Sequence, residues 1–410
     1  MAYLLYYIKL RLVVVLTCLL CCCYLTGSAQ FFDMDNVKRA YIPFKFARNL
    51  VVIQLKINNK GPYNFVLDSG VGFMVITEPS LADSIQILNK RTIKISGFGI
   101  GEDYEAYVTP PLKVDIPGLY SNNVSAAILK KDHFGLSNYA GMPIHGLLGY
   151  EFFSQLAVKV SFSDSTITVA RPKDMRHYRN PIKIPISIEN KKPYLTTKVV
   201  FANGTVKYSK LIVDLGAGHY LSMENVENKN DLQKKYINAN LGMGIKGLIS
   251  GSLSRIDEVD LGKYKLKNII TAFPDYDTRT LSVPRDGNIG MGLLKKFNII
   301  FDYPNGVMYL KPNFNFTNPC EHDMSGLGYY SLGDADNHII IYNVEPGSAG
   351  DKMGLQKDDE IVSINFRPVK MMSLQEIDDL FKSQNGRTFA IEIFRDKKYY
   401  RRLLTLKRRI

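Results

Sequence analysis

The sequence predicts a mainly β protein with two pseudo-symmetric β-barrel lobes and a small α+β domain behind them. Short apolar runs separated by turn residues predict the strands, and the phrase FVLDSG at 65–70 is echoed by LIVDLG at 211–216, which predicts the two lobes. The last stretch changes to a mixed strand and helix pattern. We therefore expect lobe one over 30–175, lobe two over 182–312 and the small domain over 325–410.

The repeated phrase is one of three landmarks that occur in the same order in both halves. Each copy is an apolar run that ends in an aspartate, Asp68 or Asp214, and glycines then allow a sharp turn. A glycine-rich stretch begins 29 residues after the first aspartate and 28 residues after the second. An element ending in Gly149 or Gly290 follows in each half. This order predicts an internal duplication that brings the two carboxylates together across a pseudo-twofold axis.

The N-terminus has the pattern of a signal peptide over residues 1–29. Lys9 and Arg11 precede an apolar run of about 14 residues, and small residues follow up to Ala29. The run is shorter than the roughly 20 residues that span a bilayer. We expect export to the periplasm or cell envelope of a bacterium, with an uncleaved N-terminal anchor as the alternative. The mature chain would keep only Cys320, which excludes an internal disulfide.

The net charge of +13 is concentrated near the C-terminus, where eight Lys and Arg residues lie between 395 and 409. A solvated edge hairpin accounts for them, and attraction to an anionic polymer is the alternative. No recognition motif accompanies the charge, so we expect no nucleic-acid partner. Six histidines without close pairing argue against a metal site, and no organic cofactor is implied.

The first two units resemble the aspartic peptidases, specifically the retropepsin-like group, over about residues 40–312. The matching motifs are Asp68-Ser69-Gly70 and Asp214-Leu215-Gly216, followed by LLG at 147–149 and NIG at 288–290. The resemblance implies an exported aspartic endopeptidase. Because both lobes belong to one chain, the active site would need no dimer, and we expect a monomer.

The resemblance also implies a role for each motif residue. Asp68 and Asp214 would form a dyad that shares one proton and activates a water to attack a peptide carbonyl. Ser69 would brace the dyad, while Gly70 and Gly216 keep its loops tight. The glycine-rich stretches would be flap tips that close over an extended peptide or unfolded protein. The expected flap residues are Gly97, Phe98, Gly99, Gly242 and Gly244.

Lobe two departs from the family pattern at Leu215, where Ser or Thr is usual. Half of the bracing hydrogen bonds would therefore be missing. This departure supports a second hypothesis, a non-catalytic envelope protein that binds peptides in a degenerate protease cleft. The proximity of the Asp68 and Asp214 carboxylates discriminates between the two hypotheses.

The last unit resembles a PDZ domain. Its opening residues match the family's Gly-Leu-Gly-Phe loop and are Gly326, Leu327, Gly328 and Tyr329. Ser373 and Glu376 form a capping box that predicts a helix after it. The resemblance implies that the loop holds the C-terminal carboxylate of a peptide, which lies as an added strand beside that helix. The domain would recruit or gate peptide substrates, or would be a structural cap that has lost its ligand.

Overall fold

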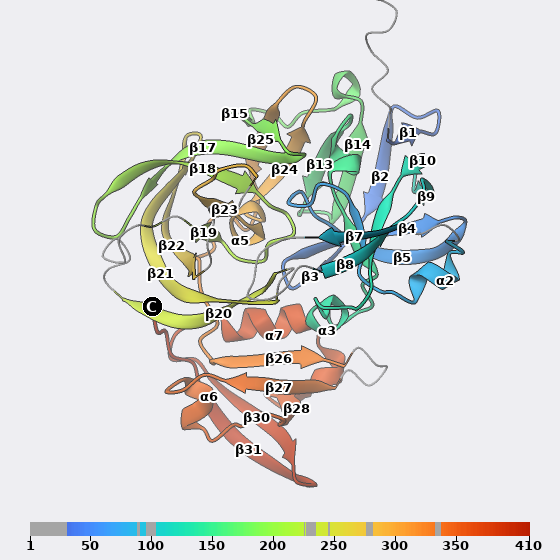
Figure 1. Ribbon diagram of the computed structural model, residues 1–410. Helices are drawn as coiled ribbons and strands as arrows, with labels where there is room; N and C mark the ends of the chain where they lie inside the picture. Colours follow the sequence, from blue (N-terminus) through green and yellow to red (C-terminus); the bar gives the residue numbers. More distant parts are fainter. Residues whose placement is uncertain are drawn as a thin grey trace, which may run out of the picture.

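The computed structural model describes residues 31–87, 91–95, 104–224, 226, 235–244, 247–275, 282–332 and 338–410. The fold class is confirmed: these residues are mainly β, and the helices among them are short (Figure 1). The signal peptide predicted over 1–29 lies outside this part of the chain. In the described ranges, no helix is long and apolar enough to cross a membrane.

The first half of the chain builds an eleven-stranded sheet in the order β1-β10-β9-β4-β5-β12-β6-β11-β8-β7, with β3 paired to β4. Strand β4 shows why these segments are strands, because buried Leu55 and Ile57 alternate with exposed Gln54 and Lys56. Helices α2 (Leu81–Ser84), α3 (Leu136–Ala140) and α4 (Tyr150–Phe153) lie in its connections. The strands are β1 (Asp33–Met34), β3 (Lys45–Ala47), β4 (Leu50–Ile57), β5 (Lys60–Leu67), β6 (Met74–Ile76), β7 (Arg91–Ile95), β8 (Tyr104–Val108), β9 (Leu112–Ile116), β10 (Leu119–Val124), β11 (Ala126–Leu129) and β12 (Gly146–Leu148).

The second half builds an eight-stranded sheet in the order β16-β17-β18-β23-β19-β22-β21-β20. An additional pairing of β17 with β21 closes this sheet on itself. Helix α5 (Met291–Leu294) follows its NIG element. The strands are β16 (Ser187–Glu189), β17 (Lys192–Val200), β18 (Val206–Val213), β19 (Leu221–Met223), β20 (Tyr236–Gly244), β21 (Gly247–Leu261), β22 (Tyr264–Pro274) and β23 (Gly287–Ile289).

A six-stranded sheet joins the two halves, in the order β15-β25-β24-β13-β14-β2. Three of its strands come from each half, and β13 pairs with β24 in an antiparallel way at the middle. The 3₁₀ helix η1 (Pro172–Asp174) follows β14. The strands are β2 (Arg39–Pro43), β13 (Ala157–Ser161), β14 (Thr166–Ala170), β15 (Ile182–Pro185), β24 (Phe297–Asp302) and β25 (Val307–Pro312).

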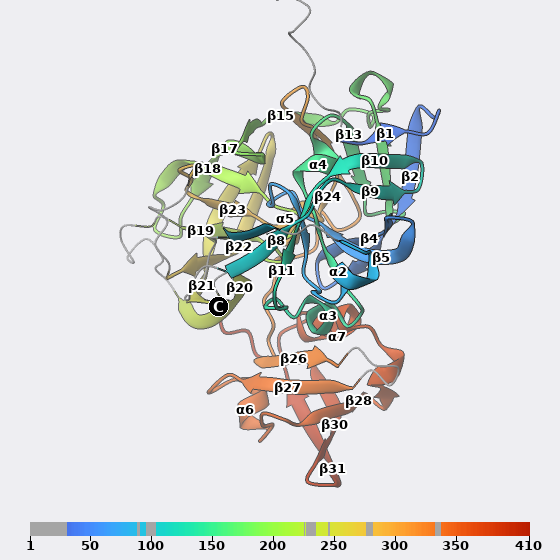
Figure 2. The ribbon, with the colours of Figure 1, turned by 45° about the vertical axis from the view of Figure 1, so that its right-hand side comes forward.

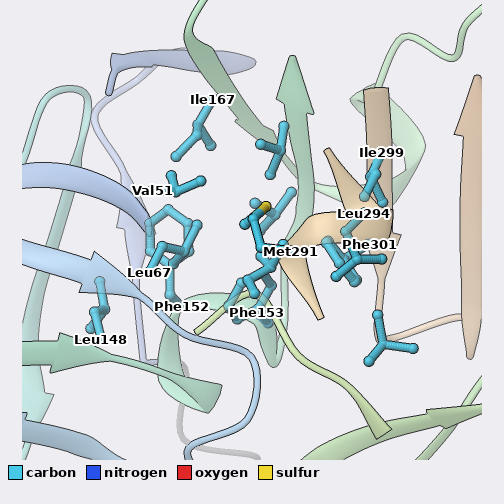
Figure 3. Close-up of a cluster of buried hydrophobic side chains, with 14 of the residues drawn as sticks. Val51, Leu67, Leu148, Phe152, Phe153, Ile167, Met291, Leu294, Ile299 and Phe301 are labelled. Atoms are coloured by element: carbon cyan, nitrogen blue, oxygen red, sulfur yellow. The ribbon is translucent and has the colours of Figure 1, made fainter. Parts of the chain in front are cut away.

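One hydrophobic core runs through both halves (Figure 3). Phe153 of α4 and Phe301 of β24 meet in it with ring centroids 5.6 Å apart, and Met291 of α5 lies in the same cluster. Burying each such side chain stabilises the fold by roughly 2 kcal/mol. The shared core therefore holds the two lobes in a fixed relation, which is what an active site between them requires.

The C-terminal domain has its own core and a sheet in the order β26-β27-β28-β30-β31, with β29 paired to β28. The capping box predicted at Ser373 and Glu376 is confirmed at the start of α7. Both views show this domain at the opposite end from the shared sheet, with α7 beside α3 (Figures 1 and 2). Its elements are β26 (Leu327–Ser331), β27 (Ile339–Val344), α6 (Ala349–Lys352), β28 (Glu360–Ile364), β29 (Arg367–Pro368), η3 (Val369–Met371), α7 (Leu374–Phe381), β30 (Thr388–Arg395) and β31 (Lys398–Thr405).

Candidate active site

Each of the repeated aspartates follows the last residue of an apolar strand. Strand β5 ends at Leu67 and pairs in parallel with β12, and the Asp68 N–H donates to the Leu148 carbonyl at 2.9 Å. In the second half β18 pairs in parallel with β23, and the Asp214 N–H donates to the Ile289 carbonyl at 2.9 Å. The same two-strand device thus presents both carboxylates.

The structure brings Asp68 and Asp214 together, with each carboxyl group packed on the glycine of the other loop. A Cβ atom placed on Gly70 would come within 2.6 Å of the Asp214 Cγ. A Cβ atom placed on Gly216 would come within 2.3 Å of the Asp68 Cγ. Each glycine N–H also donates to the aspartate two residues before it, at 2.7 Å in lobe one and 2.9 Å in lobe two. These glycines are required because no side chain fits between the loops.

The Asp68 carboxyl group is buried, with 8% of the residue exposed. Burial, followed by the charge of Asp214, raises the pKa of Asp68 well above its ordinary value of 3.8. Two carboxyl groups this close cannot both ionise at low cost, so one proton is shared between them. The pair therefore contains a proton donor and a proton acceptor side by side.

Ser69 braces the two loops from lobe one. Its hydroxyl donates to the Val213 carbonyl at 2.8 Å and accepts the Leu215 N–H at 2.9 Å. Leu215 is fully buried in the shared core and carries no hydroxyl to return the brace. Ser69 by itself thus makes two hydrogen bonds across the lobes.

Asn288 contributes to the site, although the sequence showed it only as a polar residue in the NIG element. Its side-chain amide donates to the Asp214 Oδ2 at 2.8 Å, and 7% of the residue is exposed. His219 is half-buried nearby. Desolvation lowers its pKa, while Asp214, Glu224 and Asn288 act in the opposite direction. The signal that could have identified Asn288 was a polar residue in a position that is apolar in the other lobe.

Three charged side chains lie near the second aspartate. Arg285 and Glu224 form a two-point ion pair with both N···O distances at 2.7 Å. Lys192, at the start of β17, acts on both Asp68 and Asp214, and burial lowers its pKa. No group of three or more metal-ligating side chains occurs in the described part of the chain.

Comparisons with known families agree with this geometry. The aspartyl protease family matches residues 53–152, which include Asp68 and the LLG element, and the PDZ domain family matches residues 340–395. The chain contains an aspartyl protease domain and a C-terminal PDZ domain. No curated protein matches the chain. The two domains indicate a protease-type function.

The expected flap residues fall partly within the described structure. Gly242 and Gly244 lie at the end of β20 in the β20–β21 hairpin, where the Gly242 backbone has a φ of +122° that favours glycine. Gly97, Phe98 and Gly99 lie outside the described residues. A cavity of about 770 Å³ lies between the β20–β21 hairpin and the PDZ domain, and Asn343 and Glu345 form its PDZ side.

The loop that opens the PDZ domain is hydrogen-bonded within the chain. The Gly326 N–H donates to the Asp323 Oδ1 at 2.8 Å, and the Leu327 N–H donates to the Ser325 Oγ at 3.1 Å. These N–H groups were expected to receive a peptide carboxylate. Gly328 and Tyr329 continue into β26, the edge strand of the sheet.

Arg48 of the protease domain bridges β26 and α7. Arg48, in the turn before β4, donates to the Tyr329 carbonyl at 3.1 Å and to both carboxylate oxygens of Asp378 at 3.1 and 3.0 Å. Its guanidinium lies 4.6 Å from the Tyr139 ring centroid and 4.9 Å from that of Tyr329. An added peptide strand would need this edge carbonyl. Sequence reasoning missed Arg48 because nothing local marks it.

The neighbouring residue, Asn49, joins the PDZ helix to the loop that follows Asp214 in lobe two. Its backbone N–H donates to the Gln375 Oε1 at 3.1 Å, and its side-chain amide donates to the Gly218 carbonyl at 2.9 Å. Lys295 donates to the Asn49 Oδ1 at 2.9 Å. These hydrogen bonds connect α7 to the segment that follows Asp214.

Proposed function

We propose that this protein is an aspartic endopeptidase that hydrolyses peptide bonds with a water activated by the Asp68 and Asp214 dyad. The observation that carries the proposal is the reciprocal packing of each carboxyl group on Gly216 or Gly70 of the other loop. The ionised member of the pair takes a proton from the water, and the protonated member donates to the carbonyl oxygen as charge develops there. The substrate is an extended peptide or an unfolded segment between the lobes.

Cleavage of a diverse peptide pool, read by mass spectrometry from acidic to neutral pH, tests this proposal. We expect cuts by the mature chain that disappear in both Asp68→Asn and Asp214→Asn. Asp164→Asn, at an exposed site, is the matched control and should cut like the wild type. Equal cutting by the dyad variants, or none by the wild type at any pH, would reject the proposal.

The competing function is peptide binding without cleavage, and Leu215 is the observation that favours it. Its side chain cannot return the hydroxyl brace that Ser69 provides. Binding would be supported if the wild-type protein retains peptides without cleaving them and variants of the cleft do not retain them. The same peptide pool separates the two functions, because products and retained peptides are both measured.

We further propose that the PDZ domain gates the protease domain. Three features support gating: Arg48 holds the edge of β26, Asp378 on α7 pairs with Arg48, and Asn49 bonds both α7 and the loop of lobe two. A peptide that adds to β26 must displace Arg48. Its binding would then release Asn49 and change the catalytic loop.

Binding of peptides with free C-termini to Arg48→Met tests the gate. We expect binding at least about tenfold tighter than to the wild type, because the competing guanidinium is absent. Arg367→Met is the control. It removes an exposed ion pair with Glu376, which lies on α7 as Asp378 does. Equal peptide affinity of wild type and Arg48→Met would reject gating. Proteolysis with and without the peptide then measures coupling.

Export is also part of the proposal, supported by the sequence of residues 1–29. Cell fractionation of the full chain and of a chain that starts after this segment tests it. We expect the full chain in the envelope fraction and the shortened chain in the cytoplasm. The same distribution for both chains would contradict export.

A further inference from the structure

The two aspartates differ in the donors that they accept. Each carboxylate receives the N–H of the glycine two residues later, at Gly70 or Gly216. Asp214 receives a second donor, the Asn288 side-chain amide, at 2.8 Å. Apart from its contact with Asp214, Asp68 has only the Gly70 N–H as a donor in the described part of the chain. The dyad is therefore asymmetric.

The asymmetry comes from one position that the two lobes share. Asn288 in β23 pairs with Ile212, two residues before Asp214. Leu147 in β12 pairs with Val66, two residues before the other aspartate. The fold thus places the two side chains equivalently, and only the one in lobe two can donate a hydrogen bond.

The other titratable groups that face the dyad do not explain the asymmetry. The charge of Lys192 acts on both carboxyl groups. Burial lowers the pKa of His219, and burial raises the pKa of Tyr303 well above its ordinary value, so both are uncharged near neutral pH. Glu224 and Arg285 neutralise each other in a two-point ion pair.

We infer that Asn288 is a positioning residue that fixes Asp214 as the ionised member of the dyad and Asp68 as the protonated member. This inference rests on the proposed function. An amide donor stabilises an ionised carboxylate more than a neutral carboxyl group. The shared proton therefore resides on Asp68, which is also the more buried aspartate.

The assignment gives each step a direction. The water loses a proton to Asp214 while its oxygen bonds to the peptide carbonyl carbon, and Asp68 gives its proton to the carbonyl oxygen. When the C–N bond breaks, Asp214 passes the proton to the leaving nitrogen. Asp68 regains a proton from a hydroxyl of the intermediate, so the cycle ends with the proton where it began.

The carboxyl carbon NMR signals of Asp68 and Asp214 test the inference without any need for catalysis. Signals are assigned with Asp68→Asn and Asp214→Asn, and the single-proton state is compared in three further proteins. In the wild type we expect the proton on Asp68. In Asn288→Leu we expect the ratio of the form protonated on Asp68 to the form protonated on Asp214 to fall about tenfold to a hundredfold. This is the effect of losing one hydrogen bond to a charged group.

The third protein exchanges the two side chains, with Asn288→Leu and Leu147→Asn together. The donor then faces Asp68, so we expect the proton to move to Asp214. Thermal unfolding identifies a variant that is not folded, and Asn288→Ala then replaces Asn288→Leu in the same measurement. An unchanged ratio of the two protonated forms in any folded variant without Asn288 would overturn the inference.

Kinetics provide a second readout that a merely structural role would not change. For Asn288→Leu we expect a lower kcat with nearly the same KM, and an acid limb of the pH profile that moves to higher pH. If the wild type cleaves through the dyad but the profile of Asn288→Leu does not move, only this inference fails. If the wild type cleaves nothing, the proposed function fails and NMR still decides the location of the proton.

Discussion

The Cα atom of Gly70 lies so close to the Asp214 carboxyl group that a Cβ atom there would come within 2.6 Å of its Cγ. The two residues are in different lobes. Because of this contact, the Asp214 carboxyl group of one loop leaves no room for a side chain at Gly70 of the other loop. The dyad therefore exists only while both loops remain free of side chains at this point.

Gly70→Ala should reduce kcat/KM by about a hundredfold or more, because a displacement of about 1 Å between reacting groups costs that much. Peptide cleavage kinetics measure the effect. Gly72→Ala is the matched control, since a Cβ there would lie 3.5 Å from the nearest atom, in Lys191, at an ordinary contact distance. Similar losses in both variants would contradict the steric explanation.

Ser69→Ala should destabilise the junction of the lobes by about 1–3 kcal/mol, because it leaves the buried Val213 carbonyl and Leu215 N–H without their partner. Urea unfolding measures this loss, and kcat should fall with it. Ser69→Thr keeps the hydroxyl and should retain most activity and stability. If the alanine variant is as stable as the threonine variant, the hydroxyl brace is not important.

Asp68→Asn should raise the melting temperature at neutral pH while it abolishes cleavage. The pKa of Asp68 is raised by burial and by Asp214. Its favourable contribution to the free energy of unfolding is therefore complete below pH 3.8 and is lost as the pH rises through the raised pKa. The amide of the variant has no charge to desolvate. Melting curves at acidic and neutral pH check this, and a melting temperature below that of the wild type at neutral pH would contradict it.

Glu151→Gln should stabilise the protein near pH 8. Burial raises the pKa of Glu151 from 4.5 to about 7, and the residue is 5% exposed. The neutral carboxyl group is the stable form in the fold, so its contribution is complete below pH 4.5 and is lost as the pH rises through about 7. The loss amounts to about 3 kcal/mol.

Denaturant unfolding of the Glu151→Gln variant across this pH range measures the effect. The difference from the wild type should be small near pH 4, should grow between about pH 4.5 and pH 7, and should stay level at higher pH. Glu78→Gln, at an exposed position, is the matched control. A constant difference at every pH would mean that titration of Glu151 is not the cause.

Several parts of the site could be predicted because their signals are local. The apolar runs before Asp68 and Asp214 become strands that end at the aspartates, and the capping box at Ser373 begins α7. Strand periodicity, turn glycines and helix caps act over a few residues, so they are visible in one sequence. The roles of Ser69 and the two loop glycines were implied by the family resemblance.

Other parts could not be predicted, because they depend on contacts between distant segments. Asn288 and Asp214 are 74 residues apart in the chain, and Arg48 and Asp378 are 330 residues apart. The PDZ resemblance implied a peptide beside β26, or a cap that has lost its ligand. It could not show that Arg48 of the other domain donates to the Tyr329 carbonyl of that strand.

The sequence by itself determined the duplicated strand-and-aspartate units, the helix that closes the PDZ sheet and the order of the domains. Their periodic burial and their turns depend on residues that are neighbours in the sequence. Only the tertiary structure decided which aspartate receives a second donor and what lies against the PDZ edge strand. Such choices depend on the mutual orientation of packed domains, in which a buried donor or charge finds its partner by proximity in space and not along the chain.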